Sequence, residues 1–202
     1  MDPSKTALLL IGYQNDYFAE DGILHTVIEA SSKVTNILAN TIHLLEALAD
    51  SPVLVVSTPI FFTPTYAELS EPVGILKTIK EVGAFQAGKP GSATIPELQP
   101  FQSKILEVPG KRGLNAFANT PLADLLREHG ITDVVLAGVV TSVCIDSTGR
   151  SAHERGFKVT VLSDCTSARE AFEQEFYCEN IFPLYARVLS HTEFLEALTV
   201  AA

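Results

Sequence analysis

The chain has 202 residues, of which 47% are hydrophobic, and its formal net charge at pH 7 is −10. This length fits one α/β domain spanning residues 1–202, which would bury roughly 70% of the surface of its unfolded chain. The acidic balance argues against nucleic acids and anionic membranes as partners, and no apolar run approaches the roughly 20 residues needed to span a bilayer.

The cysteine content also restricts the class of protein. Cys144, Cys165 and Cys178 are the three cysteines, and we expect no signal peptide before them. This usage fits a reducing compartment better than a disulfide framework. We therefore expect a cytoplasmic protein.

The first half of the chain predicts two strands around one helix. Thr6 to Tyr13 is a nearly continuous apolar run, typical of a central strand covered on both faces. Glu29 to Ala49 has apolar residues at helical intervals and predicts one amphipathic helix, within which His43 is expected to be a boundary residue rather than a metal ligand. Pro52 to Thr58 then contains a second buried strand.

A long, loop-rich segment follows the second strand. Phe61, Phe62 and Tyr66 are predicted to line an apolar pocket, with plain core packing as the alternative. Residues 65–109 contain several prolines and glycines, and an excursion of this length in a compact domain is typical of a lid or binding loop. Substrate contacts are therefore expected from this segment.

The second half contains a cysteine in a distinctive position. Thr132 to Leu136 predicts a buried strand, and Cys144 opens a segment with helical spacing that ends at Gly156. A thiol at a helix N-terminus lies in the positive end of the helix dipole, which favours the nucleophilic thiolate. Free backbone N–H groups there can also hold an oxyanion. The alternative is a buried structural cysteine.

The remaining elements complete an alternating pattern. Lys158 to Ser163 predicts a strand, Asp164 to Ser167 is expected to open a helix that runs to Phe182, and Ala186 to Leu189 predicts a last strand before a terminal helix. Strands that alternate with helices predict a three-layer, doubly wound, mostly parallel α/β sheet, with its active site at the carboxyl ends of the strands.

Three stretches resemble, in order, the motifs of the isochorismatase-like cysteine hydrolases, a superfamily that includes nicotinamidases and carbamoylsarcosine amidohydrolases. They are Gln14 to Phe18, Lys111 to Leu122, and Gly138 to Asp164 around Cys144. The resemblance implies an isochorismatase-like, Rossmann-like fold. It also implies cleavage of a C–N bond in a small amide, ureide or related molecule through a covalent acyl intermediate.

The resemblance assigns roles to individual residues. It implies that Cys144 is the nucleophile, that Lys111 supplies positive charge, and that the backbone N–H groups of Val140 and Cys144 hold the oxyanion. A cis peptide bond is implied between Val139 and Val140. Gln14 and Phe117 fall within the matched motifs and are expected to contribute to the substrate pocket, together with the aromatic residues after the second strand.

One position departs from the resembled family. Where the family carries a catalytic aspartate two residues before Gln14, this chain has Gly12. We expect a gap beside Cys144 and a gain in turnover when a carboxylate is restored, through general base catalysis. A second hypothesis is a divergent member with weak or lost hydrolysis that binds a small molecule or a protein partner. Vinyl-ether hydrolysis of isochorismate ranks last, because the resemblance implies that it needs the aspartate.

No cofactor and no metal are expected. Nicotinamidase-like relatives place metal ligands after the second strand, where this chain has Pro59 to Phe62, and no other His, Asp or Cys cluster has ligand spacing. The expected partners are a small-molecule substrate and further copies of the chain in a homodimer or homotetramer. The latter follows from the resemblance and from apolar residues near the C-terminus: Phe176, Tyr177, Ile181, Phe182, Leu184 and Tyr185.

Overall fold

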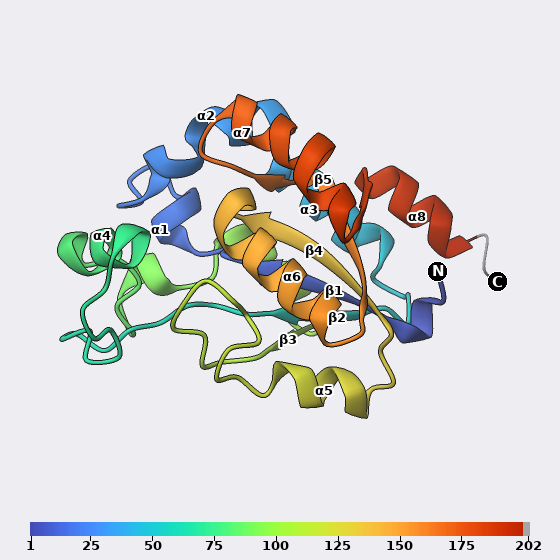
Figure 1. Cartoon of the computed structure of the whole chain (residues 1–202), viewed down its shortest axis with the longest axis horizontal. Coiled ribbons are helices and arrows are strands. Elements are labelled where there is room, and N and C mark those ends of the chain that lie inside the picture. The colour runs from blue at the N-terminus through green and yellow to red at the C-terminus, as the bar shows by residue number, and fades with distance from the viewer. Residues whose placement is uncertain (200–202) are drawn as a thin grey trace.

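The computed structural model describes residues 1–199, and six strands form one sheet in the order β3-β2-β1-β4-β5-β6 (Figure 1). Each pair of neighbouring strands is parallel, which confirms the predicted fold class. The last three residues of the expected domain lie outside the described part of the chain. The strands are β1 (Thr6–Ile11), β2 (Leu54–Ser57), β3 (Ile105–Glu107), β4 (Asp133–Val139), β5 (Lys158–Ser167) and β6 (Arg187–Leu189).

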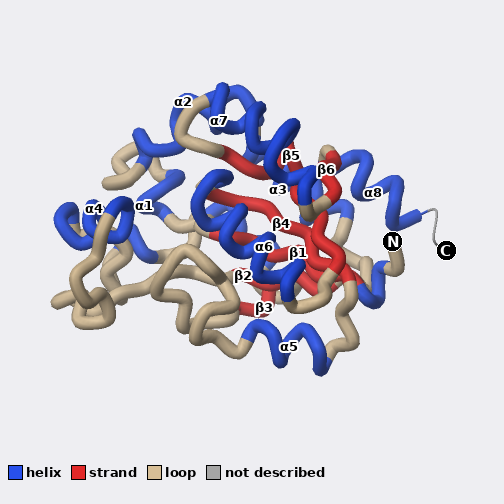
Figure 2. Tube along the Cα trace, viewed as in Figure 1, coloured by secondary structure: helices blue, strands red, loops and turns tan. Residues whose placement is uncertain are grey.

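Helices cover both faces of the sheet, and long loops gather on the side of the molecule where α1 and α4 lie (Figure 2). Within the described residues, no helix is long and apolar enough to cross a membrane. The α-helices are α1 (Asn15–Phe18), α2 (His25–Thr35), α3 (Ile37–Ala47), α4 (Gly74–Val82), α5 (Leu122–Glu128), α6 (Asp146–Glu154), α7 (Ala171–Phe176) and α8 (His191–Thr199).

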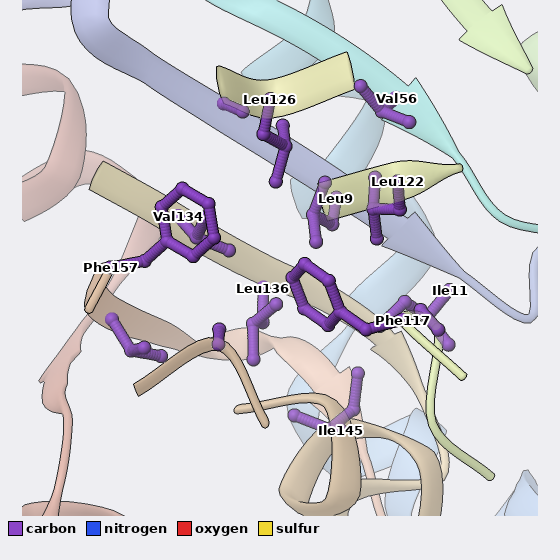
Figure 3. Close-up of a cluster of buried hydrophobic side chains, with 14 of the residues drawn as sticks. Leu9, Ile11, Val56, Phe117, Leu122, Leu126, Val134, Leu136, Ile145 and Phe157 are labelled. Atoms are coloured by element: carbon purple, nitrogen blue, oxygen red, sulfur yellow. The ribbon is translucent and has the colours of Figure 1, made fainter. Parts of the chain in front are cut away.

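The sequence of β1 explains why helices pack on both sides. All six of its residues are buried, and successive side chains of a strand point to opposite faces. Leu9 and Ile11 join a core cluster with α5 and α6 (Figure 3). Leu8 and Leu10 join a second cluster with α3 and α8. The sheet is therefore the middle of three layers.

The helix predicted from Glu29 to Ala49 is two helices, so that prediction is wrong. The helix is interrupted at Asn36, which lies between α2 and α3 and has a left-handed φ of 54°. Asparagine tolerates this conformation better than most residues because its short polar side chain forms local hydrogen bonds. The Asn40 side chain binds the carbonyl oxygen of Thr35 at the break. The apolar spacing alone did not reveal this interruption.

Strand β5 is longer than predicted and contains an irregular segment. Asp164 to Ser167 was expected to open a helix, but it continues the strand. Leu136 of β4 pairs with Val161, whereas Gly138 pairs with Thr166, so residues 162–165 lie opposite Ala137 alone. Such a bulge changes the direction in which side chains point. Asp164 and Cys165 both belong to this bulge.

Candidate active site

Cys144 lies just beyond the carboxyl end of the central strand β4. The Val139–Val140 peptide bond is cis, as the resemblance implied, and a single π-helical turn from Thr141 to Ile145 then leads into α6. Gly138 allows this path, because a β-carbon there would lie 1.9 Å from the carbonyl oxygen of Ile11. The Cys144 side chain is buried, with 7% of the residue exposed. The sequence thus places a thiol at the carboxyl ends of the strands, where ligands bind in parallel α/β proteins.

Lys111 reaches the same point from the loop after β3. Its backbone forms a parallel bridge with Ile60, and the residue is 2% exposed. The Lys111 Nζ donates a hydrogen bond to the Cys144 Sγ over 3.6 Å. An ammonium group in this position stabilises negative charge on the sulfur. The pairing that the resemblance implied for these two residues is present in the geometry.

A small cavity connects these two side chains. Its volume is about 10 Å³, which is room for about one water molecule. Ile75, Leu76 and Ile79 of α4 lie on one side of it, and Gly12 and Tyr17 also contribute. The other lining residues are Ile60, Lys111, Gly113, Leu114, Val139, Val143 and Cys144. The site is therefore closed and largely apolar, with polar groups from Tyr17, Lys111 and Cys144.

Tyr17 brings a phenol to this cavity that the sequence analysis did not single out. Its side chain is buried, and its ring packs against Phe85 with centroids 5.1 Å apart. Burial raises the pKa of the Tyr17 hydroxyl, and the nearby Cys144 raises it further. The hydroxyl consequently remains protonated at neutral pH and is able to donate a hydrogen bond.

Gly12 does not leave the gap that the sequence analysis expected. Its φ is +77°, and a β-carbon built there would lie 2.8 Å from the Val139 Cγ2 and 2.9 Å from the Val139 carbonyl oxygen. The cavity touches the Gly12 backbone, but the direction of a side chain is filled. The chain has adapted its backbone to glycine, so a carboxylate cannot simply be restored at this position.

Asp16, the carboxylate residue nearest to Gly12 in the sequence, binds backbone and does not line the cavity. The Asp16 Oδ2 accepts a hydrogen bond from the backbone N–H of Phe85 over 2.6 Å, and the residue is not part of the cavity lining. Burial raises the pKa of Asp16, which the bond from Phe85 partly opposes. Asp16 therefore fixes a loop behind the cavity.

The five residues expected in the substrate pocket lie outside the lining of the closed cavity. Gln14 binds backbone: its Nε2 donates to the carbonyl oxygens of Ile60 and Ser92, and its Oε1 accepts from the Ile60 N–H. Phe62 and Tyr66 pack in a core cluster that also contains residues of the cavity lining. Phe117 belongs to the core cluster that includes residues of α5 and α6, and Phe61 is half-buried. The packing alternative holds for Phe62 and Tyr66.

The sequence analysis missed the apolar residues of α4 that close the site. Ile75, Leu76 and Ile79 occupy one face of a helix within the segment that was predicted as a lid or binding loop. Their one, three and four residue spacing was a usable helical signal. The surrounding prolines and glycines obscured it.

A larger cavity of about 760 Å³ adjoins the closed one, and both are lined by Ile75, Leu114 and Val143. Charged side chains at this outer cavity are paired with each other. Arg150 lies 2.9 Å from Asp146, and Arg169 lies 2.8 Å from Glu173. The outer cavity thus offers a polar approach to the apolar site.

Side chains that can bind a metal ion are scarce in the closed cavity but gather on the other face of the sheet. Among the residues that line the closed cavity, Cys144 alone has a Cys, His, Asp or Glu side chain. On the opposite face of the sheet, ligand atoms of Asp164, Cys165 and His191 all lie within 4.8 Å of one another. Sequence spacing did not predict this second group, because His191 is far from the other two along the chain.

Comparisons with known proteins agree with this geometry. A family model described as the isochorismatase domain matches residues 6–193. The ureidoacrylate amidohydrolase RutB of Agrobacterium fabrum is 27% identical over 215 residues, which cover 100% of this chain and 93% of that protein. The uncharacterised isochorismatase family protein YecD of Escherichia coli O157:H7 is 40% identical over 88 residues, but these cover only 44% of this chain and 47% of that protein.

Solved structures share the whole architecture. A cysteine hydrolase from Pseudomonas syringae superposes with a TM-score of 0.88 at 22% identity, covering 100% of this chain and 96% of that one. An isochorismatase-like hydrolase from Alkaliphilus metalliredigens gives a TM-score of 0.81 at 27% identity, covering 96% of this chain and 98% of that one.

Proposed function

The chain belongs to the isochorismatase family of hydrolases, and we propose that it cleaves a C–N bond of a small amide or ureide with Cys144 as the nucleophile. One observation carries the proposal: the buried Lys111 ammonium donates to the Cys144 sulfur inside a closed cavity. Burying an ammonium is expensive unless a partner compensates for it, and a thiolate is such a partner. The chemistry of this pair therefore favours a role for Cys144 as a nucleophile.

In the first half of the proposed reaction, the Cys144 thiolate attacks the carbonyl carbon of the substrate. The backbone N–H groups of Val140 and Cys144 hold the oxygen of the tetrahedral intermediate. As the C–N bond breaks, the leaving nitrogen takes a proton from the Lys111 ammonium. An acyl thioester of Cys144 and a neutral Lys111 remain.

In the second half, water attacks the thioester and gives its proton to Lys111. The carboxylic acid leaves, and the thiolate and ammonium pair is regenerated. Lys111 therefore performs the proton transfers that the family assigns to the aspartate, because Gly12 has no side chain and Asp16 binds the Phe85 N–H. Tyr17 remains a donor that can orient the substrate.

The hydrolysis is proposed to need no metal at this site. Zinc sites use three or four Cys, His, Asp or Glu ligands, and the lining residues provide one such side chain. The apolar residues of α4 instead exclude water from the reacting atoms. Exclusion of water strengthens the electrostatic effect of Lys111 on the sulfur.

We also propose that the protein is a homo-oligomer. Phe172 on α7 is 75% exposed and stacks with Phe176, and Leu184 is 74% exposed. Of the residues named before as the basis for association, Phe182 is instead buried in the core. Large exposed apolar side chains that lie close together favour burial against a second copy.

The test of the proposed function is a hydrolysis screen with small amides, ureas and ureides. The parent protein, Cys144→Ala and Cys178→Ala are assayed side by side, with product release followed by mass spectrometry. Activity in the parent and in Cys178→Ala, with none in Cys144→Ala, supports the proposal. A protein that binds panel members without releasing product would favour the binding-protein hypothesis.

A further inference from the structure

The irregular segment of β5 brings together three side chains that are separated from the catalytic cavity by the sheet. Asp164 and Cys165 lie in the bulge opposite Ala137, and His191 is the first residue of α8. Cys165 belongs to the core cluster formed with α3 and α8, whereas Cys144 belongs to the cluster formed with α5 and α6. This group therefore has no part in the proposed hydrolysis.

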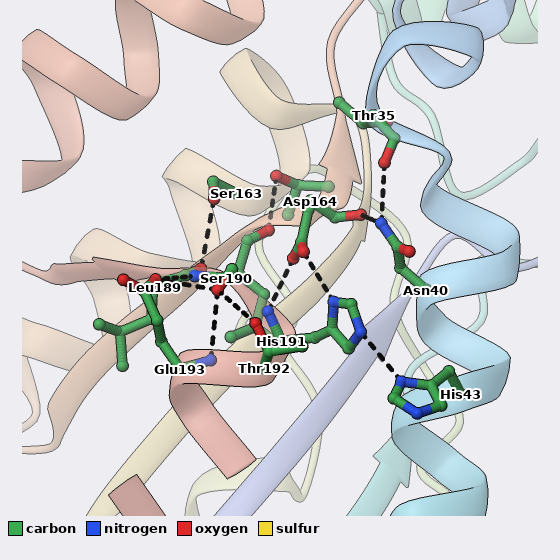
Figure 4. Close-up of polar contacts among 12 residues, drawn as sticks. Thr35, Asn40, His43, Ser163, Asp164, Leu189, Ser190, His191, Thr192 and Glu193 are labelled. Atoms are coloured by element: carbon green, nitrogen blue, oxygen red, sulfur yellow. Dashed lines mark hydrogen bonds and ion pairs between the residues drawn. The ribbon is translucent and has the colours of Figure 1, made fainter. Parts of the chain in front are cut away.

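His191 is held on three sides (Figure 4). Its backbone N–H donates to the Asp164 Oδ1 over 2.8 Å, and its Nδ1 lies 2.7 Å from the Asp164 Oδ2. Its Nε2 lies 3.0 Å from the Nδ1 of His43 on α3. A histidine whose second ring nitrogen is hydrogen-bonded is typical of metal ligands, because the outer partner fixes both the tautomer and the ring orientation.

The three donors are those that zinc prefers. Zinc binds sulfur at about 2.3 Å and nitrogen or oxygen at about 2.0–2.2 Å, so tetrahedral ligand atoms lie about 3.3–3.8 Å apart. The present atoms of Asp164, Cys165 and His191 lie within 4.8 Å of one another. To reach this range, the longer separations must contract by about 1 Å, whereas the His191 Nδ1 and the Asp164 Oδ2, now 2.7 Å apart, must move apart by about 0.6 Å.

We propose that Asp164, Cys165 and His191 bind one divalent ion of the zinc type, with water in the fourth position. The ion bonds to the Cys165 Sγ, a carboxylate oxygen of Asp164 and the Nδ1 of neutral His191. The Cys165 thiol releases its proton to solvent, and the His191 proton moves from Nδ1 to Nε2, from which it is donated in a hydrogen bond to the Nδ1 of His43. One proton is released for each ion bound.

The surroundings allow an ion to arrive and determine what it does. The side chains of Asp164 and His191 are 27% and 11% exposed, which gives a path from solvent, while Cys165 is fully buried. Burial raises the pKa of the Cys165 thiol, and Asp164 raises it further, so the thiol is protonated before the ion binds. A bound ion would tie α8 to β5 and stabilise the folded state by mass action.

Titration of the metal-free full-length protein with cobalt(II) tests the site, because a cobalt–thiolate bond has a charge-transfer absorption band in the near ultraviolet. We expect one equivalent to produce the band in the parent, in Cys144→Ala and in Cys178→Ala, and none in Cys165→Ala. Asp164→Asn keeps an acceptor for the His191 N–H and should weaken cobalt binding at least tenfold. Zinc should displace the cobalt and raise the melting temperature of the parent.

Three results would overturn the site. They are a parent protein without the band, a band that persists in folded Cys165→Ala, and a band that disappears in Cys144→Ala. In the first case Asp164 and His191 form only a structural hydrogen bond. Circular dichroism of each variant ensures that loss of the band is not loss of the fold, and Asp164→Asn provides a second test if Cys165→Ala does not fold.

Discussion

The backbone of Gly12 packs so tightly against Val139 that a β-carbon at position 12 would lie 2.9 Å from the Val139 carbonyl oxygen. The left-handed φ of +77° adds strain for any residue with a side chain. The substitution of glycine for the family's aspartate is therefore built into the course of the chain between β1 and α1. It is more than the loss of a carboxylate.

We predict that Gly12→Asp lowers the free energy of unfolding by about 2–4 kcal/mol and does not raise turnover, because strain and overpacking add. Urea denaturation measures the first quantity, and the amide screen measures the second. Gly130→Ala is a matched control, since Gly130 has a φ of +66° and open space around its β-carbon position. We expect Gly130→Ala to lower the free energy of unfolding by about 1 kcal/mol, which measures the strain of the left-handed backbone without the overpacking. A stable Gly12→Asp with increased turnover would contradict this account and favour the earlier expectation.

Removing the charge at Lys111 should slow both halves of the reaction. Lys111→Met keeps most of the apolar stem, and we expect turnover to fall about 10²–10⁴-fold because the proton donor is lost. The rate of Cys144 alkylation by iodoacetamide should fall as well, since the ammonium no longer stabilises the sulfur. Lys158→Met, at an exposed position on β5, is the control and should retain parental rates. Unchanged turnover in Lys111→Met would remove this residue from the mechanism.

Asp16 gives a pH dependence whose sign is fixed by its burial. Its pKa is raised above the ordinary value of 3.8, so the folded state favours the protonated form more than the unfolded state does. The stability that this preference contributes is present below 3.8 and is lost as the pH rises through the raised value. Asp16→Asn keeps an acceptor for the Phe85 N–H but cannot titrate. The unfolding free energy of the parent minus that of Asp16→Asn should therefore decrease from pH 3 to about pH 7; an increase would reverse the assignment.

The oligomer proposal predicts a solution mass above the 21.8 kDa of one chain. Light scattering at several concentrations measures it. Phe172→Glu should shift the protein toward the monomer, because a charge would have to be buried in the interface. Val73→Glu is the control, since Val73 is also exposed but belongs to a different segment, immediately before α4. A monomeric parent protein would contradict the proposal.

The sequence predicted features that depend on local patterns. Apolar runs located β1, β2 and β4, and alternation with helices predicted the parallel sheet. Motif resemblance predicted that Lys111 and Cys144 would meet, although they come from different loops. The strands and the sheet depend on residues whose neighbours in the chain already favour the same structure, whereas the contact of Lys111 with Cys144 was predicted from the resemblance alone.

Features that arise from packing between distant segments were not predicted. Asn36 interrupts a sequence whose apolar spacing is otherwise helical, and the β5 bulge becomes visible only in the register with β4. The space around Gly12 is filled by Val139, from another strand. His191 and Asp164 are likewise far apart in the sequence and are brought together only by the packing of α8 against β5. Local sequence carries little information about such contacts.

The nucleophilic role of Cys144 is the central claim, and acylation tests it directly. Burial raises the pKa of Cys178 to about 11 and that of Cys165 further, so both are protonated thiols at neutral pH. The parent protein is mixed with p-nitrophenyl acetate, quenched in acid and analysed by intact-protein and peptide mass spectrometry. The account predicts one acetyl group on Cys144, formed at a similar rate in Cys178→Ala and absent in Cys144→Ala. Acetylation confined to Cys165 or Cys178, or amide hydrolysis that continues in Cys144→Ala, would contradict it.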